Sequence, residues 1–218
     1  MKDKRKKDKG YKMTTLKAPA CLIIMDGFGL AQPSDANAIS IANKPNLNRY
    51  LDENVVCVLQ ASGEAVGLPA GQMGNSEVGH LNIGAGRIVD QELTRINKAC
   101  KNHEINNNEI LIKACSNAKD NNGVLHLMGL ISDGGVHSSN EHLYALLDLA
   151  IMQDVENVFV HCFLDGRDVP PTSGADYISQ LEHIILKKNE NAQKTGKKTK
   201  IEIASIQGRY YVMDRDNR

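Results

Sequence analysis

The sequence VLHLMGLISDGGVHS, residues 124–138, joins a run of apolar residues to a polar turn that contains two adjacent glycines. Its apolar part, 124–132, has the length and composition of one buried β-strand. Similar apolar runs return at 158–165 and 201–206, and polar residues with glycine follow each of them. Uninterrupted apolar runs of this kind are typical of parallel strands that helices cover on both faces.

Helical periodicity fills the intervals between these three runs. Apolar residues fall on one stripe in 141–152 and again in 176–188, and a further helix is predicted at 109–118. The predicted capping boxes pair Ser138 with Glu141 and Ser173 with Asp176. Because strands and helices alternate, the sequence predicts an α/β fold with a largely parallel sheet.

The segment before this alternation has a different character. Two more strand-like runs are expected at 21–26 and 55–61. Seven glycines then occur within residues 63–86, which predicts a ligand-binding loop or hinge with a domain boundary close after it. The lysine- and asparagine-rich stretch 187–200 is expected to be a surface loop.

Charge is unevenly distributed along the chain of 218 residues, although Lys plus Arg and Asp plus Glu both number 26. Residues 1–17 contain eight basic and two acidic residues, and Met13 is an alternative start. Such a block is typical of a solvated disordered tail, and an RNA or anionic-membrane anchor is the alternative. No secretory signal follows it, and no apolar stretch reaches the roughly 18 residues of a membrane span.

The five cysteines form no C-x-x-C pair, so we expect free, buried thiols in a reducing compartment rather than a zinc site. They are Cys21, Cys57, Cys100, Cys115 and Cys162.

Two residues of the first part of the chain are candidates for chemistry. Asp26 ends an apolar run and precedes Gly27, so it is either a ligand of a hard cation or the start of an Asx turn. Ser76 lies between glycines in GNSEVGH. It is either an exposed nucleophile or an ordinary loop serine. Three motifs are excluded, because the P-loop, serine-hydrolase and dinucleotide patterns fail at His80, Val78 and Val89 respectively.

Basic side chains follow each strand of the predicted sheet. His137 follows the first strand, Arg167 the second, and Arg209 and Arg215 the third. Each alone is typical of a turn or surface residue. Because ligands bind beyond the carboxyl ends of parallel strands, and because arginine binds phosphate or carboxylate with two parallel hydrogen bonds, together they predict an anion pocket.

Five motifs together resemble the cofactor-independent phosphoglycerate mutases, which belong to the alkaline-phosphatase-like metalloenzymes. They are MDGFG at 25–29, GQMGNSEVGHLNIGAGR at 71–87, SDGGVHS at 132–138, DGRDVPPTS at 165–173 and GRYYVMDRDNR at 208–218. The resemblance implies interconversion of 2- and 3-phosphoglycerate in glycolysis and gluconeogenesis, in the cytoplasm, by a monomer. It implies no bisphosphoglycerate cofactor and no nucleic-acid or membrane partner.

The resemblance also assigns roles to residues. Ser76 matches the serine that becomes phosphorylated, and Asp26 and Ser76 match ligands of two divalent ions, usually Mn²⁺. The remaining matches are with residues that hold phosphoglycerate, and Asp168 among them would bind the glycerate hydroxyls. These are His137, Arg167, Asp168, Arg209 and Arg215.

The family architecture implies three parts for this chain. After the basic tail 1–17, residues 18–88 match the start of a phosphatase-like domain with its hinge, and 89–218 match an inserted α/β transferase domain. Family chains are more than twice this long, so both domains are expected to be incomplete. The other metal ligands would then be missing, the strands at 21–26 and 55–61 would expose their apolar faces, and the chain alone is predicted to be inactive.

Two alternatives remain on the sequence. A non-catalytic phosphoglycerate-binding fragment would use the arginine pocket but would have no need of Ser76. Another enzyme of the superfamily, a phosphopentomutase or a phosphatase, fits the motifs from His137 to Arg215 less well.

Overall fold

The structure is a computed structural model that describes residues 19–214. The basic tail expected at 1–17 and Arg215 lie outside the described residues. The chain divides into two compact units, Met1–Leu59 and Gln60–Arg218.

The described part of the first unit contains only two helices, α1 (Ala38–Ile41) and α2 (Pro45–Glu53). The strands predicted at 21–26 and 55–61 are wrong, because neither stretch adopts strand structure. Their apolar side chains are exposed, with Leu22 at 73% and Val55 at 96%. A strand needs a neighbour that accepts and donates its backbone hydrogen bonds, and among residues 19–214 these two runs pair with none.

The glycine-rich segment 63–86 is more ordered than the predicted loop. It forms the 3₁₀ helix η1 (Gly63–Val66) and the helix α3 (Ser76–Ala85), and these share a small core of Val66, Leu68 and Val78. Gly67 has a φ of +81°, and a Cβ there would lie 2.0 Å from the carbonyl oxygen of Val89. Here the glycine permits close packing of the backbone rather than mobility.

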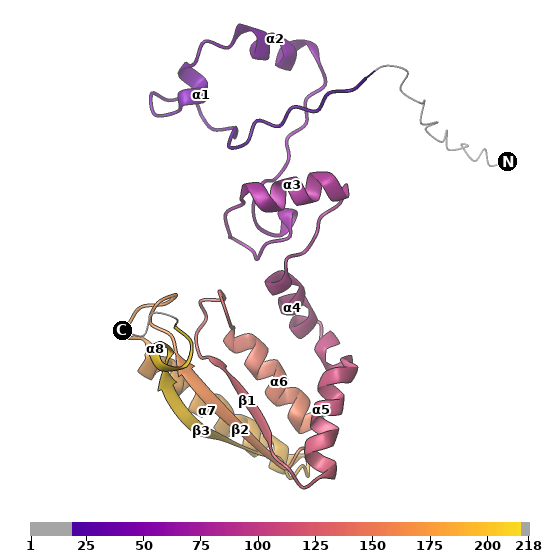
Figure 1. Ribbon diagram of the computed structural model, residues 1–218, viewed down its shortest axis with the longest axis vertical. Coiled ribbons are helices and arrows are strands. Elements are labelled where there is room, and N and C mark those ends of the chain that lie inside the picture. Colours follow the sequence, from indigo (N-terminus) through magenta and orange to yellow (C-terminus); the bar gives the residue numbers. More distant parts are fainter. Residues whose placement is uncertain (1–18, 215–218) are drawn as a thin grey trace, which may run out of the picture. The chain divides into compact units, whose positions relative to one another are not determined.

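The rest of the second unit is the predicted α/β arrangement (Figure 1). Strands β1 (Leu125–Leu130), β2 (Asn157–Leu164) and β3 (Lys200–Gly208) form a parallel sheet in the order β1-β2-β3. Helix α6 (Asn140–Met152) connects β1 to β2, and α7 (Gly174–Lys194) connects β2 to β3. The alternating order, the parallel sheet and the three strand positions are therefore confirmed.

The structure contains more helices than were predicted, and the predicted ones differ at their ends. Helix α5 (Glu109–Asp120) is confirmed, whereas α4 (Glu92–Lys101), η2 (Glu104–Asn107) and α8 (Arg209–Val212) were not predicted. Helix α7 continues through half of the loop expected at 187–200, because no glycine interrupts it before Gly196. Both capping boxes are wrong, since the N-cap residues Ser139 and Ser173 make no side-chain capping hydrogen bond.

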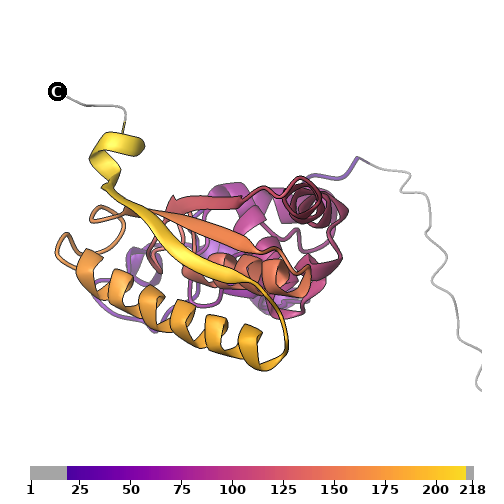
Figure 2. The same cartoon turned by 90° about the horizontal axis from the view of Figure 1, so that it is seen from below.

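The main core lies between the sheet and its helices. Val158, Val160 and Cys162 of β2 are at most 1% exposed and pack with residues of α5, α6 and α7. Figure 2 shows α6 and α7 on the same side of the sheet. Alternate residues point away from this core, and Met128 of β1 is 68% exposed there. The expectation that both faces are covered is therefore wrong for β1.

A β-bulge separates two registers between β2 and β3. Val160 is level with Ile203, but His161 is level with Ser205, so Ala204 is an extra residue in β3. One consequence is a row of polar side chains across the sheet. His126 Nδ1 lies 2.9 Å from His161 Nε2, and His161 Nδ1 lies 2.8 Å from Ser205 Oγ.

Candidate functional site

Ser76 is the first residue of α3, and its side chain is exposed. The preceding Asn75 caps this helix, because its side-chain oxygen accepts a hydrogen bond of 3.1 Å from the amide of Val78. The sequence therefore predicted an exposed hydroxyl correctly, but Ser76 begins a helix rather than lying in a loop.

His80, one helical turn later, contacts Ser76 through its Nδ1. This nitrogen lies 2.8 Å from the carbonyl oxygen of Ser76 and 3.2 Å from Ser76 Oγ. The tautomer that carries a proton on Nδ1 donates it to this carbonyl oxygen, whereas the other tautomer can accept a hydrogen bond from the Ser76 hydroxyl. Only the second tautomer could take the proton of the serine through this atom.

The ends of β1, β2 and β3 meet at a buried carboxylate, Asp165, whose side chain is 1% exposed. Its Oδ1 accepts hydrogen bonds from the amides of Arg167 at 3.1 Å and Asp168 at 3.0 Å. This is an Asx turn, and Gly166 permits it with a φ of +92°. Its Oδ2 accepts a 2.8 Å hydrogen bond from the hydroxyl of Ser132, which follows β1.

Arg209 follows β3 and joins this cluster as a buried cation with a side chain 5% exposed. Its Nη1 lies 3.0 Å from Asp165 Oδ1 and 2.7 Å from Asp168 Oδ2, while its Nε lies 2.9 Å from Asp214 Oδ1. Such charge-assisted bonds compensate the burial of the guanidinium. The hydrogen bond to Asp168, followed by those to Asp214 and Asp165, raises the pKa of Arg209 above its ordinary value.

The same contacts hold Asp165 ionised. Burial alone would raise its pKa, but hydrogen bonds from the amides of Asp168 and Arg167, from Ser132 and from Arg209 reverse the effect. The net result is a pKa of Asp165 below its ordinary value.

The other predicted substrate-binding residues are more accessible. The Arg167 side chain is 70% exposed and lies 3.8 Å from Asp214, and the Asp168 side chain is 16% exposed. His137 is exposed in the loop after β1. That loop approaches the loop after β2 closely, because a Cβ on Gly134 would lie 3.2 Å from Cβ of Asp168.

The structure thus brings Arg167, Asp168 and Arg209 together, with His137 on an adjoining loop. Asp26 occupies a turn in the first unit, where the amide of Phe28 bonds the carbonyl of Met25, and Ser76 belongs to the second unit. Sequence reasoning assigned no role to three further residues of the cluster. They are Ser132, Asp165 and Asp214.

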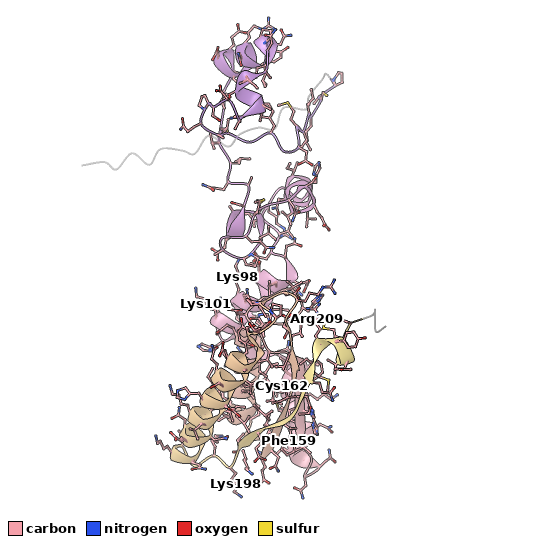
Figure 3. All side chains as sticks on the ribbon, turned by 90° about the vertical axis from the view of Figure 1, so that its left-hand side faces the viewer. Lys98, Lys101, Phe159, Cys162, Lys198 and Arg209 are labelled. Carbon is pink, nitrogen blue, oxygen red and sulfur yellow. The ribbon has the colours of Figure 1, made fainter. Side chains whose placement is uncertain are left out.

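A signal for two of these three was present in the sequence. Ser132 and Asp165 are the first polar residues after two buried strands, the same criterion that selected the arginines. Figure 3 labels Arg209 near one end of the sheet and Lys198 near the other, in agreement with a site at the carboxyl ends of the strands.

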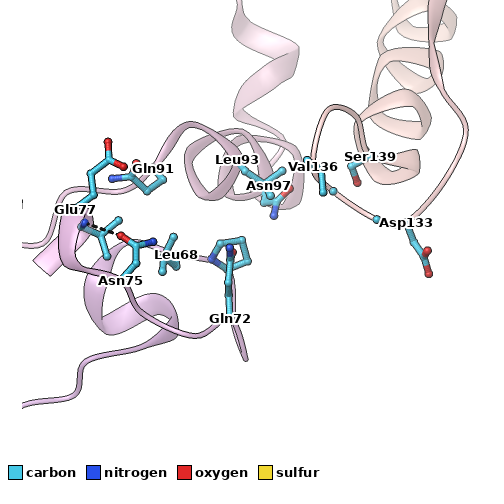
Figure 4. A pocket seen from close by; sticks show the side chains of 14 residues that line it. Leu68, Gln72, Asn75, Glu77, Gln91, Leu93, Asn97, Asp133, Val136 and Ser139 are labelled. Atoms are coloured by element: carbon cyan, nitrogen blue, oxygen red, sulfur yellow. Dashed lines mark hydrogen bonds between the residues drawn. The ribbon is translucent and has the colours of Figure 1, made fainter. Parts of the chain in front are cut away.

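A cavity of about 540 Å³ lies between the glycine-rich segment and the loop after β1 (Figure 4). Leu68, Asn75 and Glu77 line one side of it, and Asp133 and Val136 line the other. Its described lining includes acidic residues but neither lysine nor arginine, so this cavity does not suit a phosphorylated acid. Two guanidinium groups, those of Arg167 and Arg209, lie instead in the cluster at the strand ends, together with the three carboxylates of Asp165, Asp168 and Asp214.

The expected metal site is incomplete in the part of the chain that is described. Asp26 and Ser76 supply one carboxylate and one hydroxyl, which are too few donors for two divalent ions. Across residues 19–214, no group of three or more His, Cys, Asp or Glu side chains is arranged to hold a metal ion. Across the same residues, no helix has both the length and the apolar character of a membrane span.

Comparison with known proteins gives a consistent result. A family described as "BPG-independent PGAM N-terminus" matches residues 96–218. A 2,3-bisphosphoglycerate-independent phosphoglycerate mutase of Clostridium beijerinckii is 54% identical over 202 residues, which are 93% of this chain and 38% of that protein. The corresponding protein of Moorella thermoacetica is 56% identical over 200 residues, 92% of this chain and 37% of that protein.

Among solved structures, phosphoglycerate mutase of Leishmania mexicana, crystallised at low cobalt concentration, aligns with a TM-score of 0.57 and 37% identity. That alignment covers 88% of this chain and 34% of the Leishmania chain. This chain therefore spans little more than a third of the length of the proteins it matches.

Proposed function

Because this chain belongs to the family of 2,3-bisphosphoglycerate-independent phosphoglycerate mutases, we propose that its parent protein interconverts 2- and 3-phosphoglycerate. The observation that carries the proposal is the arginine cluster after three parallel strands, where Arg209 is held by three carboxylates and Arg167 is exposed beside it. The substrate carries a phosphate and a carboxylate, and the exposed guanidinium of Arg167 can bind either of them.

In this proposal Ser76 receives the phosphoryl group. Its oxygen forms a bond to phosphorus, the bond between phosphorus and the glycerate oxygen breaks, and that oxygen takes a proton. The glycerate then turns, and its other hydroxyl attacks the phosphoserine, which restores Ser76. The exposed position of Ser76 at the start of α3 supports this role, because the amides of a helix N-terminus attract phosphate.

His80 Nδ1 could take the proton of Ser76 only in the tautomer that does not donate to the carbonyl oxygen of Ser76. The resemblance to the family implies that Asp26 and Ser76 would be among the ligands of two manganese ions, which would supply the activation of the serine hydroxyl. The donors of Asp26 and Ser76 do not fit two cations by themselves, so we propose manganese dependence only for a protein that supplies further ligands.

Roles for the remaining residues follow from their exposure. Arg167 and His137 would contact the charged groups of the substrate, and Asp168 would accept hydrogen bonds from the glycerate hydroxyls. Arg215, outside the described residues, would add a further cation. We also propose that 18–88 begins a phosphatase-like domain, that 89–218 belongs to a transferase domain, and that the protein is a cytoplasmic monomer without nucleic-acid or membrane partners.

The test is conversion of 3-phosphoglycerate by the full-length protein with Mn²⁺ and without bisphosphoglycerate, followed by phosphorus NMR. We expect Ser76→Ala to lower turnover by at least about a thousandfold. Ser62→Ala is the matched control, because Ser62 is an exposed serine that precedes η1 and makes no capping hydrogen bond. Turnover that survives in Ser76→Ala would reject the serine as the nucleophile.

A second function applies to the 218-residue chain by itself. The cluster around Arg209 is assembled within this chain, whereas residues 19–214 include no group of three or more His, Cys, Asp or Glu side chains arranged to hold a metal ion beside Ser76. We therefore propose that the chain alone binds phosphoglycerate without converting it. Calorimetry should detect binding of 3-phosphoglycerate, and phosphorus NMR should detect no product. Manganese-dependent turnover by the chain alone would reject this proposal.

A further inference from the structure

Asp165 differs from the other carboxylates of the cluster, and from Arg167, in being almost fully enclosed. Its side chain is 1% exposed, compared with 16% for Asp168, 26% for Asp214 and 70% for Arg167. Both of its oxygens already accept hydrogen bonds from the protein. A substrate therefore cannot reach this carboxylate, so any effect of Asp165 on the reaction must pass through its neighbours.

Those neighbours come from all three strand ends. Asp165 Oδ2 accepts a hydrogen bond from the hydroxyl of Ser132, which follows β1. Asp165 Oδ1 accepts hydrogen bonds from the amides of Arg167 and Asp168, which follow β2, and from Nη1 of Arg209, which follows β3. One carboxylate thus connects the three loops that follow β1, β2 and β3. The parallel strands bring these loops to the same edge of the sheet, but they do not by themselves bond the loops to one another. The two amide bonds determine where the Arg167–Asp168 turn begins, because an Asx turn fixes the backbone of the two residues after it.

The orientation of Arg209 depends on the same group. Its guanidinium uses Nη1 for Asp165 and Asp168 and Nε for Asp214, and none of its hydrogen bonds within residues 19–214 involves Nη2. Because the guanidinium is planar, fixing two of its nitrogens fixes the direction of the third. Loss of the bond to Asp165 would leave that direction less defined.

We infer that Asp165 is a positioning residue, which sets the direction of Arg209 and the turn of Arg167 and Asp168 for a phosphorylated hydroxy acid. This inference rests on the proposed function for its substrate. It adds a residue that touches no substrate and acts by pre-organising those that do.

Asp165→Asn in the full-length protein is the sharpest test, because asparagine keeps the shape and most hydrogen bonds but removes the charge. We expect the KM for 3-phosphoglycerate to rise about tenfold, with a smaller change in kcat. The matched control is Asp154→Asn, since Asp154 precedes the same strand at its other end and asparagine tolerates its φ of +60°. The control should leave KM unchanged.

A double-mutant cycle separates positioning from a general loss of structure. If Asp165 acts through Arg209, Asp165→Asn should have little further effect on KM in an Arg209→Lys background. Ser132→Ala, which removes one donor to Asp165, should raise KM by roughly two- to threefold. An unchanged KM in Asp165→Asn would overturn the inference. So would a double variant whose rise in KM equals the product of the rises in Asp165→Asn and Arg209→Lys.

One readout does not depend on the substrate. In the ¹⁵N-labelled protein, the Nε–H signal of Arg209 should be sharp and slow to exchange, and Asp165→Asn should broaden it while Asp154→Asn does not. An unaffected signal in Asp165→Asn would overturn the inference. If Asp165→Asn broadens this signal in a protein that does not convert phosphoglycerate, the proposed function fails and the positioning role stands.

Discussion

Two sets of apolar runs have similar sequences and opposite outcomes in this molecule. The runs at 158–165 and 201–206 lie in β2 and β3, where Val158 and Ile201 are at most 1% exposed. The runs at 21–26 and 55–61 form no strand, and Leu22 and Val55 face solvent. An apolar composition allows a segment to form a strand. The strand forms only where a neighbouring strand pairs with its backbone and other residues cover its apolar side chains.

Thiol labelling should show the largest contrast between the two regions. The expected burial of the thiols is wrong for Cys21 and Cys57, which are exposed, and correct for Cys115 and Cys162; burial raises the pKa of Cys162 to about 11. Since a buried thiol reacts only after local opening, which costs roughly 4 kcal/mol or more, we expect Cys162 to react at least about a thousandfold more slowly. Timed alkylation with peptide mass spectrometry measures both rates in one sample. Similar rates would mean that the sheet opens as readily as the first unit.

Core truncation should give the next largest contrast. Leu147 of α6 is 0% exposed in the main core, and Leu59 is 86% exposed. We expect Leu147→Ala to lower the free energy of unfolding by about 3 kcal/mol, because it removes buried contacts and leaves a cavity. Leu59→Ala should change it by less than about 0.5 kcal/mol. Urea titration of both variants tests this, and equal effects would contradict the comparison.

The glycine-rich segment between the two sets of runs permits a finer test. Gly67 and Gly71 both have positive φ, but a Cβ at Gly67 would lie 2.0 Å from the carbonyl oxygen of Val89, whereas a Cβ at Gly71 would meet open space. Gly71→Ala should therefore cost about 1 kcal/mol from its conformation alone, and Gly67→Ala about 2 to 3 kcal/mol. Hydrogen exchange at the amide of Gln91, which bonds the carbonyl of Gly67, reports the difference. Equal exchange in the two variants would reject the close packing.

Acid should produce the smallest effect, at the carboxylate cluster of the second unit. The pKa of Asp165 is lowered in the folded protein, so its contribution to stability is present above its unfolded pKa, near the ordinary value of 3.8, and is lost as the pH falls through the folded pKa. Denaturant titrations at several pH values should show a shallower acid slope for Asp165→Asn than for the unmutated protein. If the free energy of unfolding depends on pH in the same way in both proteins, folding does not favour the ionised form of Asp165.

Much of the α/β region could be predicted from sequence because its signals are local and mutually consistent. Apolar runs gave the positions of β1, β2 and β3, and helical periodicity gave α5, α6 and α7. Helix α3 was missed because glycines suggested a loop, while the small core of Val66, Leu68 and Val78 depends on contacts between separate turns. The runs at 21–26 and 55–61 were assigned as strands because composition does not report whether a pairing partner is present.

The candidate site was predicted only in part for a related reason. Residues at the strand ends, such as Arg209 and Asp168, were identified from their position, and the structure places them in contact. Their contact with a buried carboxylate was not predicted, since an aspartate before glycine suggests a turn as readily as an ion pair. How Asp26 relates to Ser76 stays a prediction, because the two residues belong to different units.

The bulge at Ala204 has a consequence for how related sequences compare in length. Before the bulge, each residue of β2 is level with the residue of β3 that is 43 positions later in the sequence, and after the bulge with the residue 44 positions later. Leu164 is therefore level with Gly208, and Arg209 follows Gly208 as Asp165 follows Leu164. A descendant that lost Ala204 would keep this alignment through a regular ladder, whereas a residue lost from β3 after the bulge would move Arg209 by about 3.3 Å. We therefore expect a one-residue deletion at Ala204 to be tolerated better than a deletion a few residues later in β3.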